Sequence, residues 1–157
     1  MSKVSAIPPG FHSVTPSIIV KDPDAAIAWY KKALGAEEIM VLRSPQGAVM
    51  HAEIKIGDSI IMLGGEWPDM GMKAPVPGHT SGGLHVYVTD VDKSFQRAVD
   101  AGASVTFPPS VMFWGDRYGK IVDPYGHHWG IATHVEDVAP EECARRAAAW
   151  KPENCGG

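Results

Sequence analysis

Side chains that could bind or transform a ligand gather in one stretch, residues 112–130, with the sequence MFWGDRYGKIVDPYGHHWG. Trp114 and Tyr118 could stack on a planar ligand. Arg117 could bind a carboxylate through two parallel hydrogen bonds while Asp116 fixes its guanidinium group. Because adjacent residues of a strand point to opposite faces, a direct pair between these two charges requires a local bend. The stretch is therefore a candidate pocket wall, and the alternative is a packed hairpin with a structural charged pair at its rim.

Histidines supply further polar candidates among the seven in the sequence. His85 and Tyr87 are two residues apart on one predicted strand, so both side chains should face the same cavity. His51 and Glu53 share the strand face opposite an apolar set, and His128 is expected to point inward from the last strand. Neutral imidazole is a common ligand of divalent metals, so a metal site remains an alternative. For each residue the competing interpretation is a structural hydrogen bond or a solvent-exposed side chain.

Composition and charge narrow the function classes. The 157 residues are 45% apolar and 20% charged, which is typical of a folded globular protein. The formal net charge is −4 and no run of lysines or arginines exceeds a pair, so we expect no nucleic-acid partner. The sequence contains no Gly-x-Ser-x-Gly elbow, phosphate-binding loop or dinucleotide fingerprint, which argues against those catalytic classes.

Targeting and redox features are few. The N-terminal residues lack an apolar core of signal-peptide length, and no stretch of eighteen apolar residues could span a membrane. We therefore expect a cytoplasmic protein with no membrane partner. Cys143 and Cys155 lie twelve residues apart without a metal-binding pattern around them, and we expect both to be free thiols.

The first half of the sequence predicts one strand, one helix and three further strands. Asp22 is a suitable N-cap with Pro23 at the first helical position, and Gly35 ends the apolar pattern, so a helix is predicted between them. Apolar or alternating runs bounded by turn residues predict the strands at residues 13–20, 38–43, 49–56 and 59–63.

The second half repeats this order. Four positions align at an offset of sixty-eight. Val20, Asp22 and Asp24 match Val88, Asp90 and Asp92, and Ile27 aligns with Phe95. A helix is predicted over residues 90–101, ended by Gly102. The strands are predicted at residues 84–88, 104–107, 117–122 and 128–133, and an Asp-Pro-Tyr-Gly turn joins the last two.

The repeat predicts an α+β fold of two βαβββ modules, at residues 12–66 and 83–134. Each module alone would leave one sheet face exposed, so we expect the two to form a curved mixed sheet with helices on one face and a cavity on the other. The Gly/Pro-rich residues 67–82 are expected to be a linker or lid, and residues 135–157 a C-terminal helix and tail.

The paired modules, with Asp-Pro-Tyr-Gly-His before the last strand, resemble the vicinal oxygen chelate superfamily, which includes glyoxalase I and bleomycin resistance proteins. The strings VMHAEIKIGDSIIML and MFWGDRYGKIVDPYGHHWGIATH are similar to its PhnB-like glyoxalase/bleomycin resistance/dioxygenase subgroup. The resemblance spans residues 12–134. It implies a homodimer and, in the enzymes of the superfamily, a divalent metal held by the first and last strands of each module.

The metal positions implied by this resemblance do not carry ligands in this sequence. They fall near Thr15 and Met62 in the first half, and near Gly83 and Gly130 in the second. Methionine and glycine side chains cannot supply the oxygen or imidazole ligands of Zn²⁺, Ni²⁺ or Mn²⁺. The resemblance therefore supports the fold and cavity but argues against glyoxalase activity.

These observations predict a protein that binds a small aromatic or planar organic molecule, as bleomycin resistance proteins do, without the usual metal site. The predicted ligand-binding residues are His51, His85, Tyr87, Trp114, Asp116, Arg117, Tyr118 and His128. One alternative is a metal-dependent lyase, isomerase or dioxygenase whose ligands have moved to His85, His51, Glu53 or His128. A second alternative is a non-catalytic interaction module whose cavity is filled by its own side chains.

Overall fold

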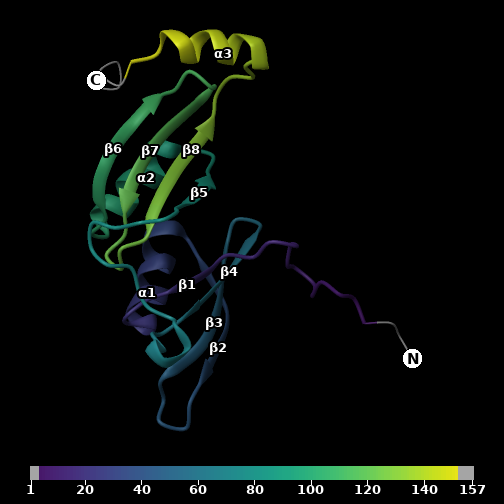
Figure 1. The fold of residues 1–157 in the computed structure, drawn as a ribbon, viewed down its shortest axis with the longest axis vertical. Helices are drawn as coiled ribbons and strands as arrows, with labels where there is room; N and C mark the ends of the chain where they lie inside the picture. Colours follow the sequence, from purple (N-terminus) through teal and green to yellow (C-terminus); the bar gives the residue numbers. More distant parts are fainter. Residues whose placement is uncertain (1–3, 152–157) are drawn as a thin grey trace. The chain divides into compact units, whose positions relative to one another are not determined.

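Each half of the repeat builds one four-stranded mixed sheet and one helix that packs against it (Figure 1). The computed structural model describes residues 4–151. The chain divides into two units, Met1–Pro75 and Val76–Gly157, so the boundary lies within the Gly/Pro-rich segment. The predicted α+β class and the order of elements are confirmed, and no helix within residues 4–151 is long and apolar enough to cross a membrane.

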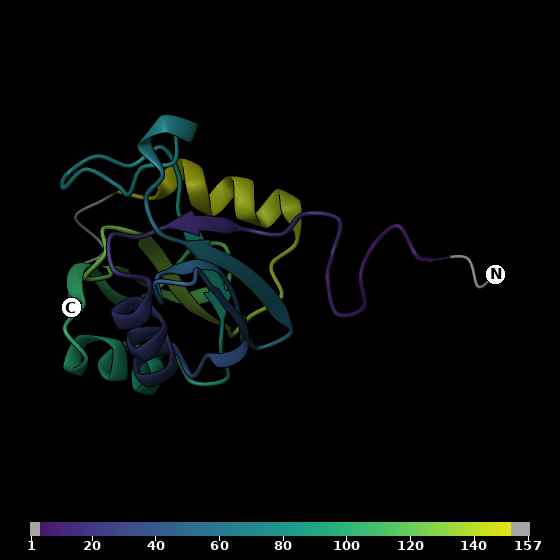
Figure 2. The same ribbon diagram turned by 90° about the horizontal axis from the view of Figure 1, so that it is seen from below.

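The first unit has the strand order β1-β4-β3-β2. Strand β1 runs parallel to β4, whereas β4, β3 and β2 are antiparallel neighbours. Residues 4–16 form no helix or strand and lead into β1 (Figure 2). The elements are β1 (Ser17–Ile19), α1 (Pro23–Leu34), β2 (Glu37–Arg43), β3 (Val49–Ile56), β4 (Ser59–Gly64) and the short 3₁₀ helix η1 (Pro68–Met70).

Helix α1 begins and ends where the sequence predicts. The Asp22 carboxylate accepts a hydrogen bond from the Ala25 amide at 3.0 Å, and Gly35 ends the helix in the left-handed conformation at φ 68°. The buried side of the helix packs on the apolar face of β3, where Ile54 is fully buried. Alternation along β3 therefore leaves His51 on the opposite face, as predicted.

The second unit has the same topology, with the strand order β5-β8-β7-β6 (Figure 1). Strand β5 is parallel to β8, and β8, β7 and β6 are antiparallel neighbours. The elements are β5 (Leu84–Tyr87), α2 (Val91–Asp100), β6 (Ser104–Val111), β7 (Asp116–Val122), β8 (His128–His134) and α3 (Pro140–Ala149).

Helix α2 covers one face of this sheet and defines its core. The side chains of Trp129, Ile121 and Ile131 are buried on the helix side. Phe95 of α2 packs directly on Gly119, where a Cβ atom would lie 2.6 Å from the ring. By strand alternation, the even-numbered residues of β7 and β8 lie on the other face.

The turn between β7 and β8 explains why this hairpin is well defined. The Gly126 amide donates to the Asp123 carbonyl at 3.1 Å, and Gly126 has a φ of 90°. The buried Asp123 carboxylate accepts from the amides of Tyr125 and His127 and from the Trp129 indole, each at 2.9 Å. The aspartate therefore fixes both the turn and the start of the last strand.

Two strands, β1 and β6, differ from prediction by more than one residue at an end. Strand β1 covers only Ser17–Ile19 instead of residues 13–20, because Pro16 lies just before its ladder with β4. Strand β6 extends to Val111 instead of ending at residue 107, and its register shifts between Phe107 and Ser110, where two prolines interrupt the pairing.

Candidate functional site

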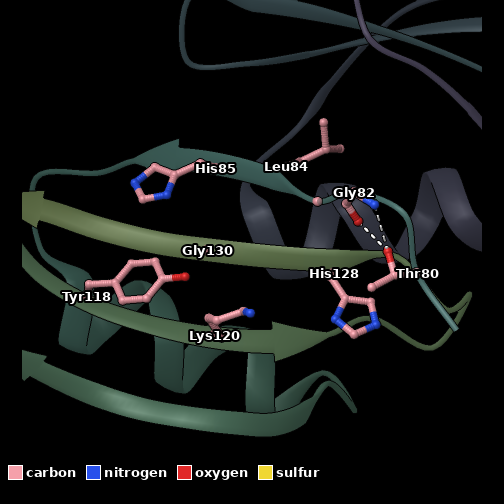
Figure 3. A pocket seen from close by; sticks show the side chains of 9 residues that line it. Thr80, Gly82, Leu84, His85, Tyr118, Lys120, His128 and Gly130 are labelled. Carbon is pink, nitrogen blue, oxygen red and sulfur yellow. Dashed lines mark hydrogen bonds between the residues drawn. The ribbon is translucent and has the colours of Figure 1, made fainter. Parts of the chain in front are cut away.

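A pocket of about 260 Å³ opens on the face of the second sheet that α2 does not cover (Figure 3). Its walls come from β5, β7, β8 and the segment that precedes β5. The pocket is lined by Thr80, Gly82, Gly83, Leu84, His85, Tyr118, Lys120, His128 and Gly130.

Strand register explains which side chains meet in this pocket. Strand β8 lies between β5 and β7, and Gly130 pairs with His85 on one side and Lys120 on the other. These three residues form one cross-strand row. Tyr118 lies two residues before Lys120 and therefore on the same face.

The rings of His85 and Tyr118 meet above Gly130. Their planes are parallel within 6° and their centroids are 5.4 Å apart. A Cβ atom on Gly130 would lie 2.7 Å from Tyr118 Cε2 and 2.8 Å from His85 Nδ1, which is closer than real contacts allow. This arrangement of the two rings therefore requires glycine at position 130, and burial raises the pKa of the Tyr118 hydroxyl.

Further aromatic rings flank this pair. Tyr87 lies 4.8 Å from His85, and Trp114 lies 5.7 Å from Tyr118, both measured between ring centroids. Phe107 contacts Tyr118 from the side of β6, at 6.1 Å. We define the aromatic row as Tyr87, His85, Tyr118 and Trp114. It runs from β5 across β8 to β7 and the turn that precedes β7.

The carboxylate of Asp116 connects the two ends of the aromatic row. It is 2% exposed and accepts hydrogen bonds from the Tyr87 hydroxyl at 2.9 Å and the Trp114 indole at 3.0 Å. His134 Nδ1 lies 2.8 Å from its other oxygen. Asp116 thereby restrains the two rings that contact His85 and Tyr118 and is a candidate positioning residue.

Electrostatics favour an ionised pair in this network. Burial alone would raise the pKa of Asp116, but hydrogen bonds from His134, Tyr87 and Trp114 outweigh it and lower that pKa. The pKa of His134 is raised by its hydrogen bond to Asp137, 2.9 Å from Nε2, and by the one to Asp116. The Tyr87 hydroxyl donates to a carboxylate, which raises its own pKa.

The hypothesis that Asp116 fixes the Arg117 guanidinium is wrong. Arg117 instead binds both oxygens of Asp92 in the first turn of α2, at 2.8 and 2.7 Å, on the helix side of the sheet. Gly115 has a positive φ of 99°, but it precedes Asp116 and leaves the strand alternation intact beyond it. The two charges therefore point to opposite faces.

The sequence-predicted site residues thus separate into groups. His85, Tyr118 and His128 line the pocket, and Tyr87, Trp114 and Asp116 adjoin it. His51 belongs to the first unit, where its Nε2 lies 3.3 Å from Glu53 Oε1.

Two polar residues of this face were absent from the predicted set. Lys120 lines the pocket, and His134 binds the Asp116 carboxylate. Strand alternation could have identified both, because Lys120 follows Tyr118 by two residues and His134 lies at even spacing from His128 on β8. The partnership of His134 with Asp116, eighteen residues earlier, leaves no comparable pattern in the sequence.

The donors present do not fit the metal that the family resemblance implies. Within residues 4–151, no group of three histidine, cysteine, aspartate or glutamate side chains is placed to hold a metal ion. In the second unit the expected last-strand position is Gly130, and in the first unit it is Met62, which pairs with Ser17 of β1. Cys143 is a free thiol, and Cys155 lies outside the described residues.

The sequence of this chain matches a known protein family and a mycobacterial relative. The family model described as the Glyoxalase/Bleomycin resistance protein/Dioxygenase superfamily matches residues 10–131. An uncharacterized protein of Mycobacterium tuberculosis is 40% identical over 134 residues, which cover 83% of this chain and 79% of that protein.

Solved structures are similar in fold. TioX from Micromonospora sp. ML1 is 28% identical with a TM-score of 0.64, and the match covers 79% of this chain and 99% of TioX. A PhnB protein from Bacillus cereus is 16% identical with a TM-score of 0.61, over 78% of this chain and 99% of that chain. At this lower identity the likeness concerns the fold alone.

Proposed function

This chain belongs to the Glyoxalase/Bleomycin resistance protein/Dioxygenase superfamily, and we propose that it binds a small planar organic molecule in the pocket of its second unit. The observation that carries this proposal is the parallel pair of rings formed by His85 and Tyr118. A planar molecule that lies parallel to one of these rings is also parallel to the other. Aromatic stacking of this kind contributes about 0.5–1.5 kcal/mol per pair beyond the area that is buried.

The size of the pocket favours a small ligand. Pockets for drug-sized molecules usually measure about 300–1,000 Å³. A pocket of about 260 Å³ lies just below that range, so we expect a molecule of one or two fused rings. Larger polycyclic compounds would extend beyond the lining residues.

The proposed activity is binding without chemical conversion. Lewis-acid chemistry in this family depends on metal ligands, and positions Met62 and Gly130 supply none. The space above Gly130 is taken by the two rings instead. Aromatic rings thus occupy the space where the family resemblance implies a metal-binding side chain. This supports a binding role for the pocket of the second unit.

Isothermal titration calorimetry with one- and two-ring aromatic compounds tests the proposal. Saturable binding to the native protein should weaken by about tenfold in Tyr118→Ala, because that substitution removes a stacking surface. Tyr125→Ala is the matched control, since it removes the same ring from the turn between β7 and β8. Equal affinity in both variants, or no saturable binding to the native protein, would contradict the proposal.

A further inference from the structure

We infer that the pocket selects an anionic aromatic compound, with a carboxylate or a similar acid group attached to the planar ring. The inference rests on the proposed function and adds the chemical class of the ligand. It follows from the charge, the hydrogen-bond donors and the unpaired lysine that line the pocket beside the aromatic row. The ring would lie against His85 and Tyr118, and the acid group would bind Lys120.

The pocket has a charge of opposite sign to the protein as a whole. The formal net charge of the chain is −4, with 18 acidic and 14 basic residues. The pocket lining nevertheless contains one lysine, two histidines and no carboxylate. An anion would therefore meet a local positive charge, and a cation would meet no partner of opposite charge in the lining.

Lys120, through its side chain, supplies a positive charge to the lining of this pocket. It pairs with Gly130 across the strands, on the same face as Tyr118, and Figure 3 shows its side chain between Tyr118 and His128. Within residues 4–151 no carboxylate lies within ion-pair distance of its ammonium group. The buried carboxylate on this face, Asp116, is already engaged by three hydrogen-bond donors.

The other polar groups of the lining suit the same ligand. A neutral imidazole carries one N–H donor, and the Tyr118 hydroxyl can also donate. Both oxygens of a carboxylate are acceptors, so His128 and Tyr118 can add hydrogen bonds to the charge of Lys120. A neutral amide of the same shape keeps the ring but lacks the charge and one of the acceptors.

Matched acid and amide pairs separate ring binding from charge recognition. We would titrate the native protein with benzoate and benzamide, and with 2-naphthoate and 2-naphthamide, by calorimetry. Each acid should bind about fivefold more tightly than its amide, which is the range expected for a partly solvated ion pair. The preference should shrink between about 50 mM and 500 mM salt because ions screen exposed charges.

Substitutions of Lys120 identify the source of the preference. Lys120→Met should abolish the preference for the acid while the affinity for the amide stays within about twofold. Lys120→Arg keeps the positive charge and should retain most of the preference. Lys93→Met is the matched control, because Lys93 is 87% exposed on α2 and pairs with Asp90 there.

The outcomes distinguish this inference from the proposed function. If acids and amides bind equally well and Lys120→Met changes neither, the anionic class is wrong while planar-ligand binding stands. If Lys93→Met removes the preference as strongly as Lys120→Met, the effect is one of overall charge and the inference is overturned. If neither member of any pair binds the native protein, the proposed function itself fails. Thermal unfolding of each variant verifies that it is folded.

Discussion

His85 and Tyr118 lie on strands that are not direct neighbours, yet their rings stack with planes parallel within 6°, and the residue between them on β8 is a glycine. Gly130 leaves the space that both rings occupy. The family resemblance implies a metal-binding position here, on the last strand of the second module. The second unit thus presents an aromatic surface at the position where a ligand to a metal would otherwise extend.

A methyl group at position 130 should displace the two rings. We expect Gly130→Ala to lower the free energy of unfolding by about 1 kcal/mol, since partly exposed rings can move aside from an overpacked site. Affinity for planar aromatic compounds should fall by about tenfold. Urea unfolding and calorimetry measure the two effects.

Gly65→Ala is the control for this substitution. Gly65 lies in the first unit, where a Cβ atom would make only ordinary contacts, the nearest at 3.6 Å from Pro23. It should leave ligand affinity unchanged. Native-like affinity in Gly130→Ala would contradict the role assigned to the rings.

Loss of the Asp116 charge should loosen the aromatic row. Asp116→Asn removes the negative charge and replaces one of the two oxygens that accept from Tyr87, Trp114 and His134 with an NH₂ donor, so we expect a loss of about 1–3 kcal/mol in stability. Tryptophan fluorescence should change because the Trp114 indole loses its charged partner. The pKa of His134, followed by NMR, should fall toward its ordinary value.

Asp137→Asn separates these effects. Asp137 also binds His134, so its loss should lower the His134 pKa as well, but it contacts neither ring of the aromatic row. Tryptophan fluorescence and ligand affinity should remain native. If tryptophan fluorescence and ligand affinity change equally in both variants, Asp116 has no special positioning role.

Stability should depend on pH through His134. Its pKa is raised in the folded protein, so its contribution to stability is complete below the pKa of the unfolded state and is lost as the pH rises through the folded pKa. Asp116 acts in the opposite direction, because its lowered pKa contributes stability that is lost as the pH falls.

The free energy of unfolding of His134→Gln, compared with the native protein across the pH range, checks this sign. The difference should be larger near pH 6 than above about pH 8. A difference that grows with rising pH would refute the assignment.

Arg117 should matter for stability and not for the ligand. Arg117→Leu breaks the paired hydrogen bonds to Asp92 on the helix side and should cost about 0.5–1 kcal/mol, as for other partly exposed ion pairs. Arg43→Leu is the matched control, since Arg43 binds Asp24 in the first turn of α1. Both variants should keep native ligand affinity. A loss of affinity confined to Arg117→Leu would show that Arg117 contributes to ligand binding.

Local sequence rules predicted most of the fold because its boundaries depend on single residues. Asp22 and Asp90 cap the two helices through their side chains, and Gly35 ends the first of them in the left-handed conformation. Alternation along β3 likewise assigned its buried and exposed faces. The end of β6 was not predictable in this way, because Pro108 and Pro109 usually terminate a strand and here lie within an irregular pairing.

The site was predictable only where neighbours along the chain determine it. The even spacing of His85 and Tyr87, and of His128 and Gly130, placed these residues on the face where they are found. The partner of Arg117 comes from a helix twenty-five residues earlier, and such long-range pairs leave no local pattern. The stacking over Gly130 depends in the same way on the order β5-β8-β7.

NMR of the histidine rings during titration with 2-naphthoate tests the central claim most directly. Stacking of a planar ligand beside Tyr118 should shift the ring signals of His85 and His128 in a saturable way, while those of the exposed His12 stay unchanged. The same titration of Tyr118→Ala should require about tenfold more ligand. Saturable binding that leaves the His85 and His128 rings unshifted would contradict the assignment of this pocket as the binding site.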